Sequence, residues 1–138
     1  MREFIPSVIT PEDAEFLSGV RPAKNPKIDH PAIAKIHKTI IDMVDASWED
    51  PAFTRLERLS KRCHDWHIDT GSNNQMPWCK YGCSVLLTDE AGAGFLEYRD
   101  GFKLEAVDHY CGLAIHSSDV EHRTHHTGTR ITYLAFLA

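Results

Sequence analysis

The chain has 138 residues, of which 42% are hydrophobic and 25% are charged, as in an ordinary soluble globular domain. Its net charge of −5 at pH 7 argues against a nucleic-acid partner, because binding to phosphates depends on a surplus of Lys and Arg. No apolar run approaches the ~18 residues of a membrane-spanning helix, and the N-terminus lacks the pattern of a signal peptide. We therefore expect a single cytoplasmic domain over residues 1–138, with no membrane partner and with free thiols at its four cysteines.

Two helices are predicted in the first 60 residues. Thr10 and Pro11 followed by Glu12 and Asp13 have the form of a helix start, with a hydroxyl N-cap, Pro at the first helical position and acids near the positive end of the dipole. Gly19 is a typical stop. A second helix begins near Pro31, where apolar side chains recur every three or four residues and form one stripe: Ile33, Ile36, Ile40, Met43 and Val44.

The second half of the chain, from about Lys61, has the pattern of short strands separated by turns. Arg99-Asp100-Gly101 is a hairpin signal between two of these segments. The predicted strands lie around residues 85–87, 95–98, 102–107, 113–115 and 131–137. We therefore expect a mainly β protein with N-terminal helices (α+β), in which residues 1–60 are mostly helical support and residues 61–138 form the β core that carries the site.

The segment Trp66-His67-Ile68-Asp69 is the first candidate for chemistry. Side chains two residues apart on a strand share a face, so His67 and Asp69 can point at one metal ion. By itself this pattern is weak, because His-x-Asp often occurs by chance. A facial triad of two histidines and one carboxylate needs one more histidine, and the candidates downstream are His109, His116, His122, His125 and His126.

From Cys63 to the C-terminus the sequence resembles the prolyl-4-hydroxylase-like branch of the Fe(II)/2-oxoglutarate oxygenases. In that family a His-x-Asp motif opens the core, the distal His follows a short Ser/Asp turn, and a Gly-x-Arg begins the last strand. The matching segments occur here in the same order: His67-x-Asp69, Val85 to Asp89, Gly92 to Tyr98, Gly112, His122 and Gly128-x-Arg130.

The resemblance implies a double-stranded β-helix (jelly-roll) core with Fe(II) bound by His67, Asp69 and His122. It also implies that Arg130 forms a bidentate salt link with the far carboxylate of 2-oxoglutarate, which suits a guanidinium fork. Thr132, on the same strand face as Arg130, and Tyr81, on the strand after His67, are further candidates for binding this carboxylate. Trp66 and Trp78 flank the site in sequence and are candidates for a substrate pocket.

The function implied is that of a dioxygenase, an oxidoreductase that couples oxidative decarboxylation of 2-oxoglutarate to hydroxylation of a small-molecule or peptide substrate, with a peptidyl prolyl residue as the nearest precedent. Ascorbate is an optional further cofactor. The alternative is a cupin-like module that binds zinc and has no oxygenase activity; a family member that has lost access for its substrate is a second alternative. The sequence leaves open whether the chain is a monomer or a dimer.

Two features depart from the family pattern or suggest another site. Arg130 follows His122 by only eight residues, a shorter separation than the family pattern leads us to expect, so His125 or His126 remains an alternative distal ligand. Cys79 and Cys83 could offer thiolates, which are good ligands for zinc. On a strand, however, residues four apart lie ~13 Å from each other, so we expect both cysteines to be buried thiols.

Overall fold

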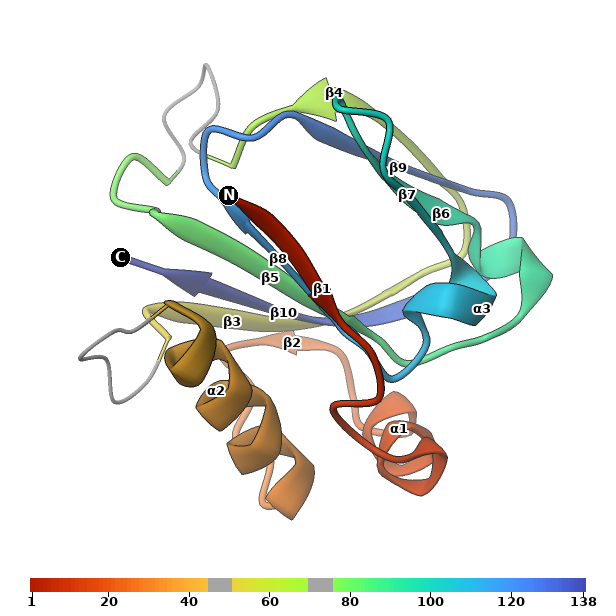
Figure 1. Cartoon of the computed structure of the whole chain (residues 1–138). Coiled ribbons are helices and arrows are strands. Elements are labelled where there is room, and N and C mark those ends of the chain that lie inside the picture. Colours follow the sequence, from red (N-terminus) through yellow and green to blue (C-terminus); the bar gives the residue numbers. More distant parts are fainter. Residues whose placement is uncertain (45–50, 70–75) are drawn as a thin grey trace.

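A computed structural model describes residues 1–44, 51–69 and 76–138 of the chain, and it consists of two antiparallel sheets with helices on one side (Figure 1). The larger sheet has the strand order β1-β8-β5-β10-β3-β2, and the smaller has the order β4-β9-β6-β7. The strands of the larger sheet are β1 (Arg2–Ile5), β2 (Ala23–Lys24), β3 (Phe53–Leu59), β5 (Tyr81–Leu86), β8 (Leu113–Ser117) and β10 (Arg130–Leu137). Those of the smaller sheet are β4 (Arg62–His67), β6 (Phe95–Tyr98), β7 (Lys103–Glu105) and β9 (His122–His126). The helical segments are α1 (Pro11–Ser18), α2 (Pro31–Val44), the 3₁₀ turn η1 (Ala91–Ala93) and α3 (Ala106–His109).

Helix α1 begins and ends where the sequence predicts. The Thr10 hydroxyl accepts a hydrogen bond from the backbone N–H of Asp13 (3.1 Å), and the Asp13 carboxylate accepts one from the backbone N–H of Thr10 (3.0 Å). This reciprocal capping box satisfies two N–H groups that would otherwise lack a partner in the first turn. Gly19 caps the C-terminal end.

Helix α2 packs its predicted apolar stripe against the outer face of the larger sheet. Ala32, Ile36 and Ile40 are buried, and they belong to the same hydrophobic cluster as Leu56 of β3 and Val85 of β5. Helices α1 and α2 lie on the side of the larger sheet that faces away from the smaller sheet (Figure 1). The main hydrophobic core is therefore between helices and sheet, which leaves the space between the two sheets for other side chains.

Strand β10 is at the centre of the larger sheet and has two different faces. Its odd-numbered residues from 131 to 137 are buried in the helix-side cluster. Its even-numbered residues from 130 to 136 line a cavity between the sheets. This alternation follows from the two-residue period of a strand, and it is why a largely apolar segment also presents Arg130 and Thr132 to the interior.

The predicted double-stranded β-helix architecture is confirmed by the two facing antiparallel sheets, and the structure adds to the prediction in one place and differs from it in another. The segment 1–60 holds the helices α1 and α2 and also contributes β1, β2 and β3 to the larger sheet. The strand expected over residues 102–107 ends at Glu105, and Ala106 begins the short helix α3.

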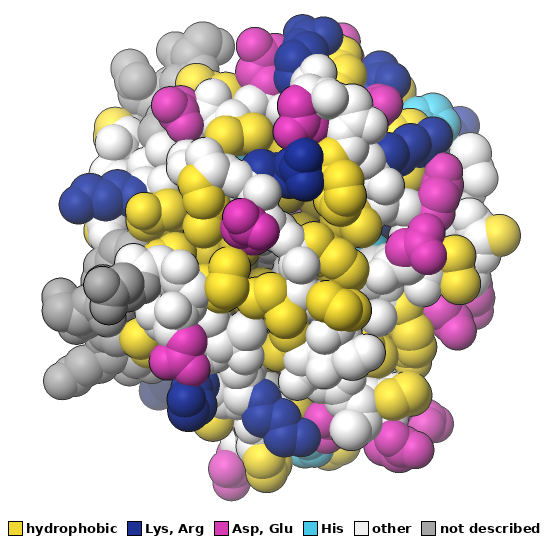
Figure 2. Space-filling view, viewed as in Figure 1, with side chains coloured by type: hydrophobic (Ala, Val, Ile, Leu, Met, Phe, Trp, Pro, Cys, Tyr) yellow, Lys and Arg dark blue, Asp and Glu magenta, His cyan; other side chains and the backbone are white. Residues whose placement is uncertain are grey.

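Charges of both signs are interspersed on the face shown in Figure 2, around a band of hydrophobic side chains. Along the described ranges of the chain, we find no helix with the length and apolar character that crossing a bilayer requires. Cys63, Cys79, Cys83 and Cys111 are free thiols.

Candidate metal centre

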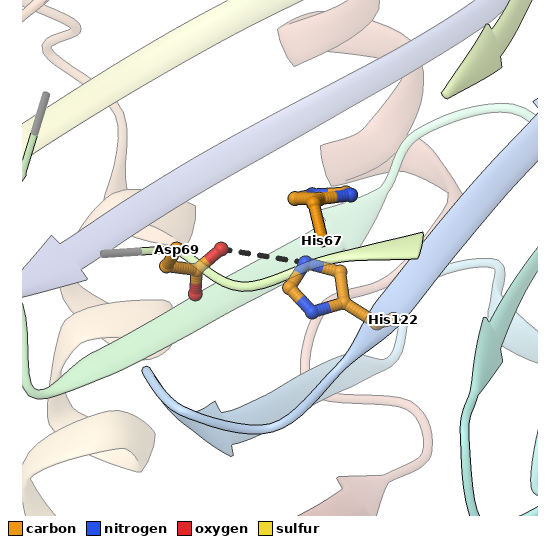
Figure 3. A group of neighbouring side chains, drawn as sticks. All are labelled: His67, Asp69 and His122. Atoms are coloured by element: carbon orange, nitrogen blue, oxygen red, sulfur yellow. Dashed lines mark ion pairs between the residues drawn. The ribbon is translucent and has the colours of Figure 1, made fainter. Parts of the chain in front are cut away.

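Three side chains converge at one end of the space between the sheets. His67 is the last residue of β4, Asp69 follows two residues later, and His122 is the first residue of β9. His67 and His122 are directly paired in the antiparallel β4–β9 ladder, so their rings lie on one face, with centroids 4.3 Å apart. One ligand atom from each of the three residues falls within 4.8 Å of the others, and Figure 3 shows the Asp69 carboxylate pointing toward His122. The three ligands proposed from the sequence are thus brought together.

Backbone carbonyls determine which ring nitrogen each histidine offers. Nδ1 of His67 lies 2.8 Å from the carbonyl oxygen of Asp65, and Nδ1 of His122 lies 2.9 Å from that of Val120. A carbonyl oxygen only accepts, so Nδ1 is the donor in both rings and the neutral imidazole keeps its lone pair on Nε2. Such contacts to the second nitrogen are usual for histidines that bind metals.

The arrangement of lone pairs fits a bound cation. Nε2 of His122 lies 3.3 Å from Oδ1 of Asp69, so the lone pair of a neutral imidazole faces a carboxylate oxygen. Two acceptors this close repel each other unless a cation or a proton lies between them. Two imidazoles and one carboxylate with open positions are the ligand set typical of non-haem Fe(II), and related His₂-carboxylate sets also bind zinc.

Asp69 is held from several sides. Its backbone N–H donates to the carbonyl oxygen of Ser118 (3.0 Å), and its side chain is only 7% exposed. Burial alone would raise the pKa of this carboxyl group, but the hydrogen bond from His116 and the proximity of the His122 ring outweigh burial and hold the pKa well below its usual range. Asp69 is therefore a carboxylate at neutral pH.

The remaining histidines have other positions. His64 stacks on His67 with ring centroids 3.7 Å apart, and burial together with the charge of His67 lowers its pKa to about 4. His109 is fully buried beside Phe4. His125 is exposed and its ring stacks on that of Phe95. Nδ1 of His126 donates to the carbonyl oxygen of Gly128 (2.7 Å). Among the five distal candidates, His122 is the one in the cluster that could hold a metal ion.

The short separation between His122 and Arg130 is accommodated by a tight turn. Strand β9 ends at His126, and Gly128 donates its N–H to the carbonyl oxygen of Gly92 (2.7 Å) before β10 begins at Arg130. A Cβ atom on Gly128 would lie 3.1 Å from the Cα of Gly92. This close approach of two glycines allows the chain to pass from the end of β9 at His126 to the start of β10 at Arg130 in a short turn.

A cavity of about 710 Å³ extends from the metal cluster into the space between the sheets. Arg130 and Thr132 line it from β10, and each is only 6% exposed. The guanidinium donates to the carbonyl oxygen of Ala93 (2.8 Å), and no carboxylate of the described residues forms an ion pair with it. Burial lowers its pKa to about 10, although the charge of Glu57, which lines the same cavity, acts in the opposite direction, so Arg130 remains a cation at neutral pH. A buried cation without a direct ion pair favours an anionic ligand.

The other predicted site residues are not all at the cavity. Trp78 lines it and is 39% exposed. Trp66 lies instead under the guanidinium groups of Arg99 and Arg123, at 4.2 and 4.6 Å from their carbon atoms. Tyr81 packs against the helix-side core, on the face of β5 opposite to the cavity. The structure therefore separates Trp66 and Tyr81 from the residues that line the cavity.

The sequence analysis named His116 only as one of five candidates for the distal ligand and did not single out Tyr98 or Gly82, although all three lie at the site. Nε2 of His116 lies 2.7 Å from Oδ2 of Asp69, and Nδ1 of the same ring lies 2.9 Å from the Tyr98 hydroxyl. Gly82 is paired with His116 across β5 and β8. The one signal in the sequence was a histidine in the apolar run Leu113-Ala114-Ile115, where another apolar residue is expected.

Cys79 and Cys83 do not belong to the cluster of possible metal ligands found among the described residues. Both are buried, and the Cys79 thiol donates to the carbonyl oxygen of Tyr81 (3.4 Å). Burial, with a contribution from the charge of Asp69, raises the pKa of Cys79 to about 12. Zinc binds the thiolate, which this high pKa disfavours, and both cysteines pack as small buried side chains.

No family model matches the chain, and no curated protein matches it. Solved structures, however, share its fold over nearly the whole chain. The viral collagen prolyl hydroxylase vCPH from Paramecium bursaria Chlorella virus-1, in complex with 2-oxoglutarate, has a TM-score of 0.71 and 12% identity, covering 98% of this chain and 93% of that one. A Pseudomonas putida prolyl-4-hydroxylase has a TM-score of 0.71 and 11% identity, covering 98% and 90%. HygX from Streptomyces hygroscopicus, with nickel and 2-oxoglutarate bound, has a TM-score of 0.62 and 14% identity, covering 96% and 79%. The chain thus has the fold of prolyl 4-hydroxylases and other 2-oxoglutarate/Fe(II) oxygenases.

Proposed function

We propose that this protein is a non-haem Fe(II) dioxygenase that couples oxidative decarboxylation of 2-oxoglutarate to hydroxylation of a substrate. The observation that carries the proposal is one cavity with the His67, Asp69 and His122 cluster at one end and the buried cation Arg130 on its wall. A module that only binds zinc has no need of a buried cation in the same cavity. A dicarboxylic keto acid accounts for both features.

The chain's own residues would hold and orient the reactants. His67, Asp69 and His122 would occupy one face of the metal and leave the opposite positions open. Arg130, with the Thr132 hydroxyl two residues away on the same strand face, would bind the far carboxylate of 2-oxoglutarate and so direct its keto end toward the metal. With Fe(II) bound, the metal would supply the oxidation in which 2-oxoglutarate and O₂ give succinate, CO₂ and one oxygen atom for a substrate C–H bond.

The finer proposal is that the substrate is a peptidyl prolyl residue. Apolar side chains line part of the cavity, including Phe53, Phe136 and the partly exposed Trp78, and such surfaces suit the uncharged five-membered ring of proline. Two of the structures with this fold are named as prolyl hydroxylases. Incubation with Pro-containing peptides, Fe(II), 2-oxoglutarate and ascorbate would test this, because hydroxylation adds one oxygen atom to the peptide mass.

The test of the proposed function is an anaerobic titration of the metal-free protein with Fe(II) and 2-oxoglutarate. We expect a weak visible charge-transfer band from the keto acid bound to iron. His67→Ala should abolish the band, and Arg130→Ala should raise the 2-oxoglutarate concentration that it needs by about 10- to 100-fold, the equivalent of one charged hydrogen-bond pair. His125→Ala is the matched control, because this histidine is exposed and away from the cluster.

The alternative functions give different results. A cupin-like zinc module would bind one metal ion per chain without forming the band at any concentration of 2-oxoglutarate. A band that forms at the same 2-oxoglutarate concentration in the wild type and in Arg130→Ala would contradict the role of Arg130. Decarboxylation of 2-oxoglutarate that no candidate peptide accelerates would count against a prolyl substrate and leave the oxygenase activity itself supported.

A further inference from the structure

Asp69 has a second hydrogen-bonding partner besides the metal cluster. Its Oδ2 lies 2.7 Å from Nε2 of His116, while its Oδ1 faces His122. Nδ1 of His116 lies 2.9 Å from the Tyr98 hydroxyl. The chain Tyr98–His116–Asp69 therefore connects the smaller sheet, through β8 of the larger sheet, to the proposed metal ligand.

The direction of the bond to Asp69 follows from the chemistry of the two groups. An ionised carboxylate only accepts hydrogen bonds, so Nε2 of His116 must donate to Oδ2. This holds in every protonation state of the ring that allows the contact. In the neutral ring Nδ1 is then the acceptor, and the Tyr98 hydroxyl donates to it.

His116 is consequently not a further metal ligand. Its Nε2 carries the proton that bonds Asp69, and its Nδ1 is engaged by Tyr98, so the neutral ring has no free lone pair for a metal ion. His116 and Tyr98 are 5% and 1% exposed, so water does not easily replace either contact. A histidine that only filled space in the core would not need a hydrogen-bond partner at both ring nitrogens.

We infer that His116, held by Tyr98, is a positioning residue that restricts Asp69 to binding the metal through one oxygen. With Oδ2 bound to His116, only Oδ1 is directed at the metal cluster. Binding through one oxygen leaves the metal three open positions, two for a chelating keto acid and one for O₂. This inference rests on the proposed function for its metal centre. It adds that a residue outside the three ligands is needed to orient Asp69.

The test uses Co(II) as the probe, titrated anaerobically into the full chain and followed by its visible d–d absorption. The Gln side chain places an N–H donor where Nε2 of histidine lies, whereas the Asn side chain places one near Nδ1. His116→Gln should therefore keep the bond to Asp69, and His116→Asn should lose it. We expect Co(II) to bind His116→Asn and His116→Leu about 10- to 100-fold more weakly than the wild type, as for other partners of metal ligands, with an altered absorption spectrum. His116→Gln should restore most of the affinity and the wild-type spectrum.

Tyr98→Phe tests the second link. It removes only the hydroxyl, and we expect a smaller loss, within about 10-fold, because the bond between His116 and Asp69 remains. Thermal melting of each metal-free variant measures general effects on the fold, which should be similar for His116→Gln and His116→Asn. If His116→Leu does not fold, the comparison between Gln and Asn still decides the question.

Two results would overturn the inference. One is Co(II) binding by folded His116→Asn or His116→Leu with the affinity and spectrum of the wild type. The other is an equal loss in His116→Gln and His116→Asn, which would show that the donor to Oδ2 is not what matters. If the wild type binds no Co(II), the metal centre itself is contradicted and the inference falls with it. A wild type that binds Co(II) but no 2-oxoglutarate would contradict the proposed function alone, and the Gln and Asn variants would still test the role of His116.

Discussion

The Asp69 carboxylate occupies the space that a side chain on Gly82 would fill. A Cβ atom built on Gly82 would overlap Oδ2 of Asp69 and would lie 2.8 Å from Nε2 of His116. Gly82 and His116 are paired across β5 and β8, so their side-chain positions are on one face of the sheet. The absence of a side chain at residue 82 is thus what allows Asp69 and His116 to meet.

Gly82→Ala should therefore weaken metal binding strongly, although it adds only one methyl group. We expect the added methyl group to displace the Asp69 carboxylate and to weaken Co(II) binding by at least about 10-fold, with a loss of about 1–3 kcal/mol in the free energy of unfolding from overpacking. Isothermal titration and urea denaturation measure the two effects. Gly19→Ala is the control, since its Cβ would have no contact closer than 3.5 Å. Wild-type metal affinity in Gly82→Ala would show that Asp69 can bind the metal from another position.

His109 should make the stability of the protein depend on pH. Burial, and then the charge of Arg130, lowers its pKa from 6.5 to about 3. The unfolded chain binds a proton between these values and the folded chain does not, so stability is lost as the pH falls from about 6.5 toward 3. Between pH 7 and pH 5 this histidine should lower the free energy of unfolding by about 2 kcal/mol.

The substitution His109→Gln isolates this effect. The Gln amide can still donate to the carbonyl oxygen of Ser84, which the ring nitrogen contacts at 3.2 Å, but it does not titrate. Urea denaturation at pH 7 and pH 5 should give a smaller difference in stability for His109→Gln than for the wild type. The exposed His125→Gln should behave as the wild type does. Equal pH dependence in the wild type and in His109→Gln would refute the prediction.

Ligand binding should stabilise the protein through Arg130. At 100 times its dissociation constant a ligand adds about 2.7 kcal/mol to the free energy of unfolding, so Co(II) with 2-oxoglutarate should raise the melting temperature above that with Co(II) alone. Arg130→Met should lose this additional shift, because the cation that binds the far carboxylate is gone. Arg58→Met, which changes an exposed residue of β3, is the matched control. An undiminished shift in Arg130→Met would place the keto acid elsewhere.

The two tryptophans proposed from the sequence should differ in effect. Trp78 lines the cavity, whereas Trp66 stacks with Arg99 and Arg123. We expect Trp78→Ala to slow oxidation of a substrate severalfold without changing the affinity for 2-oxoglutarate, and Trp66→Ala to change neither. Product analysis and titration of the keto acid separate the two quantities. A stronger effect of Trp66→Ala would mean that the substrate contacts the outside of the smaller sheet.

The N-cap of α1 offers a test of the fold that does not involve the site. Thr10→Ala removes the hydroxyl that caps Asp13 and should lower the free energy of unfolding by about 1 kcal/mol. Thr10→Ser keeps an oxygen in this position and should lose less. Thr127→Ala, in the exposed turn before β10, is a control that should have little effect. Urea denaturation of the three variants gives the comparison.

Features that depend only on neighbouring residues could be predicted from the amino-acid sequence. Thr10, Pro11 and Asp13 specify the start of α1 through hydrogen bonds within one turn, and the spacing of Ile36 and Ile40 predicts the buried face of α2. The pair His67 and Asp69 was predicted from two-residue spacing, although β4 ends at His67 and Asp69 lies just beyond the strand. Resemblance to a family then selected His122 and Arg130.

Contacts between residues far apart in the chain became visible only in the folded protein. His116 reaches Asp69 because β8 pairs with β5, and β1 and β3 join the larger sheet through partners more than 70 residues away. Hydrogen bonds between strands connect backbone groups of any sequence separation, so the local pattern of a segment does not specify its neighbour. The alternation of faces predicted Thr132 beside Arg130, but it could not place Tyr81 on the helix side of β5, because that depends on which face of the sheet the helices cover.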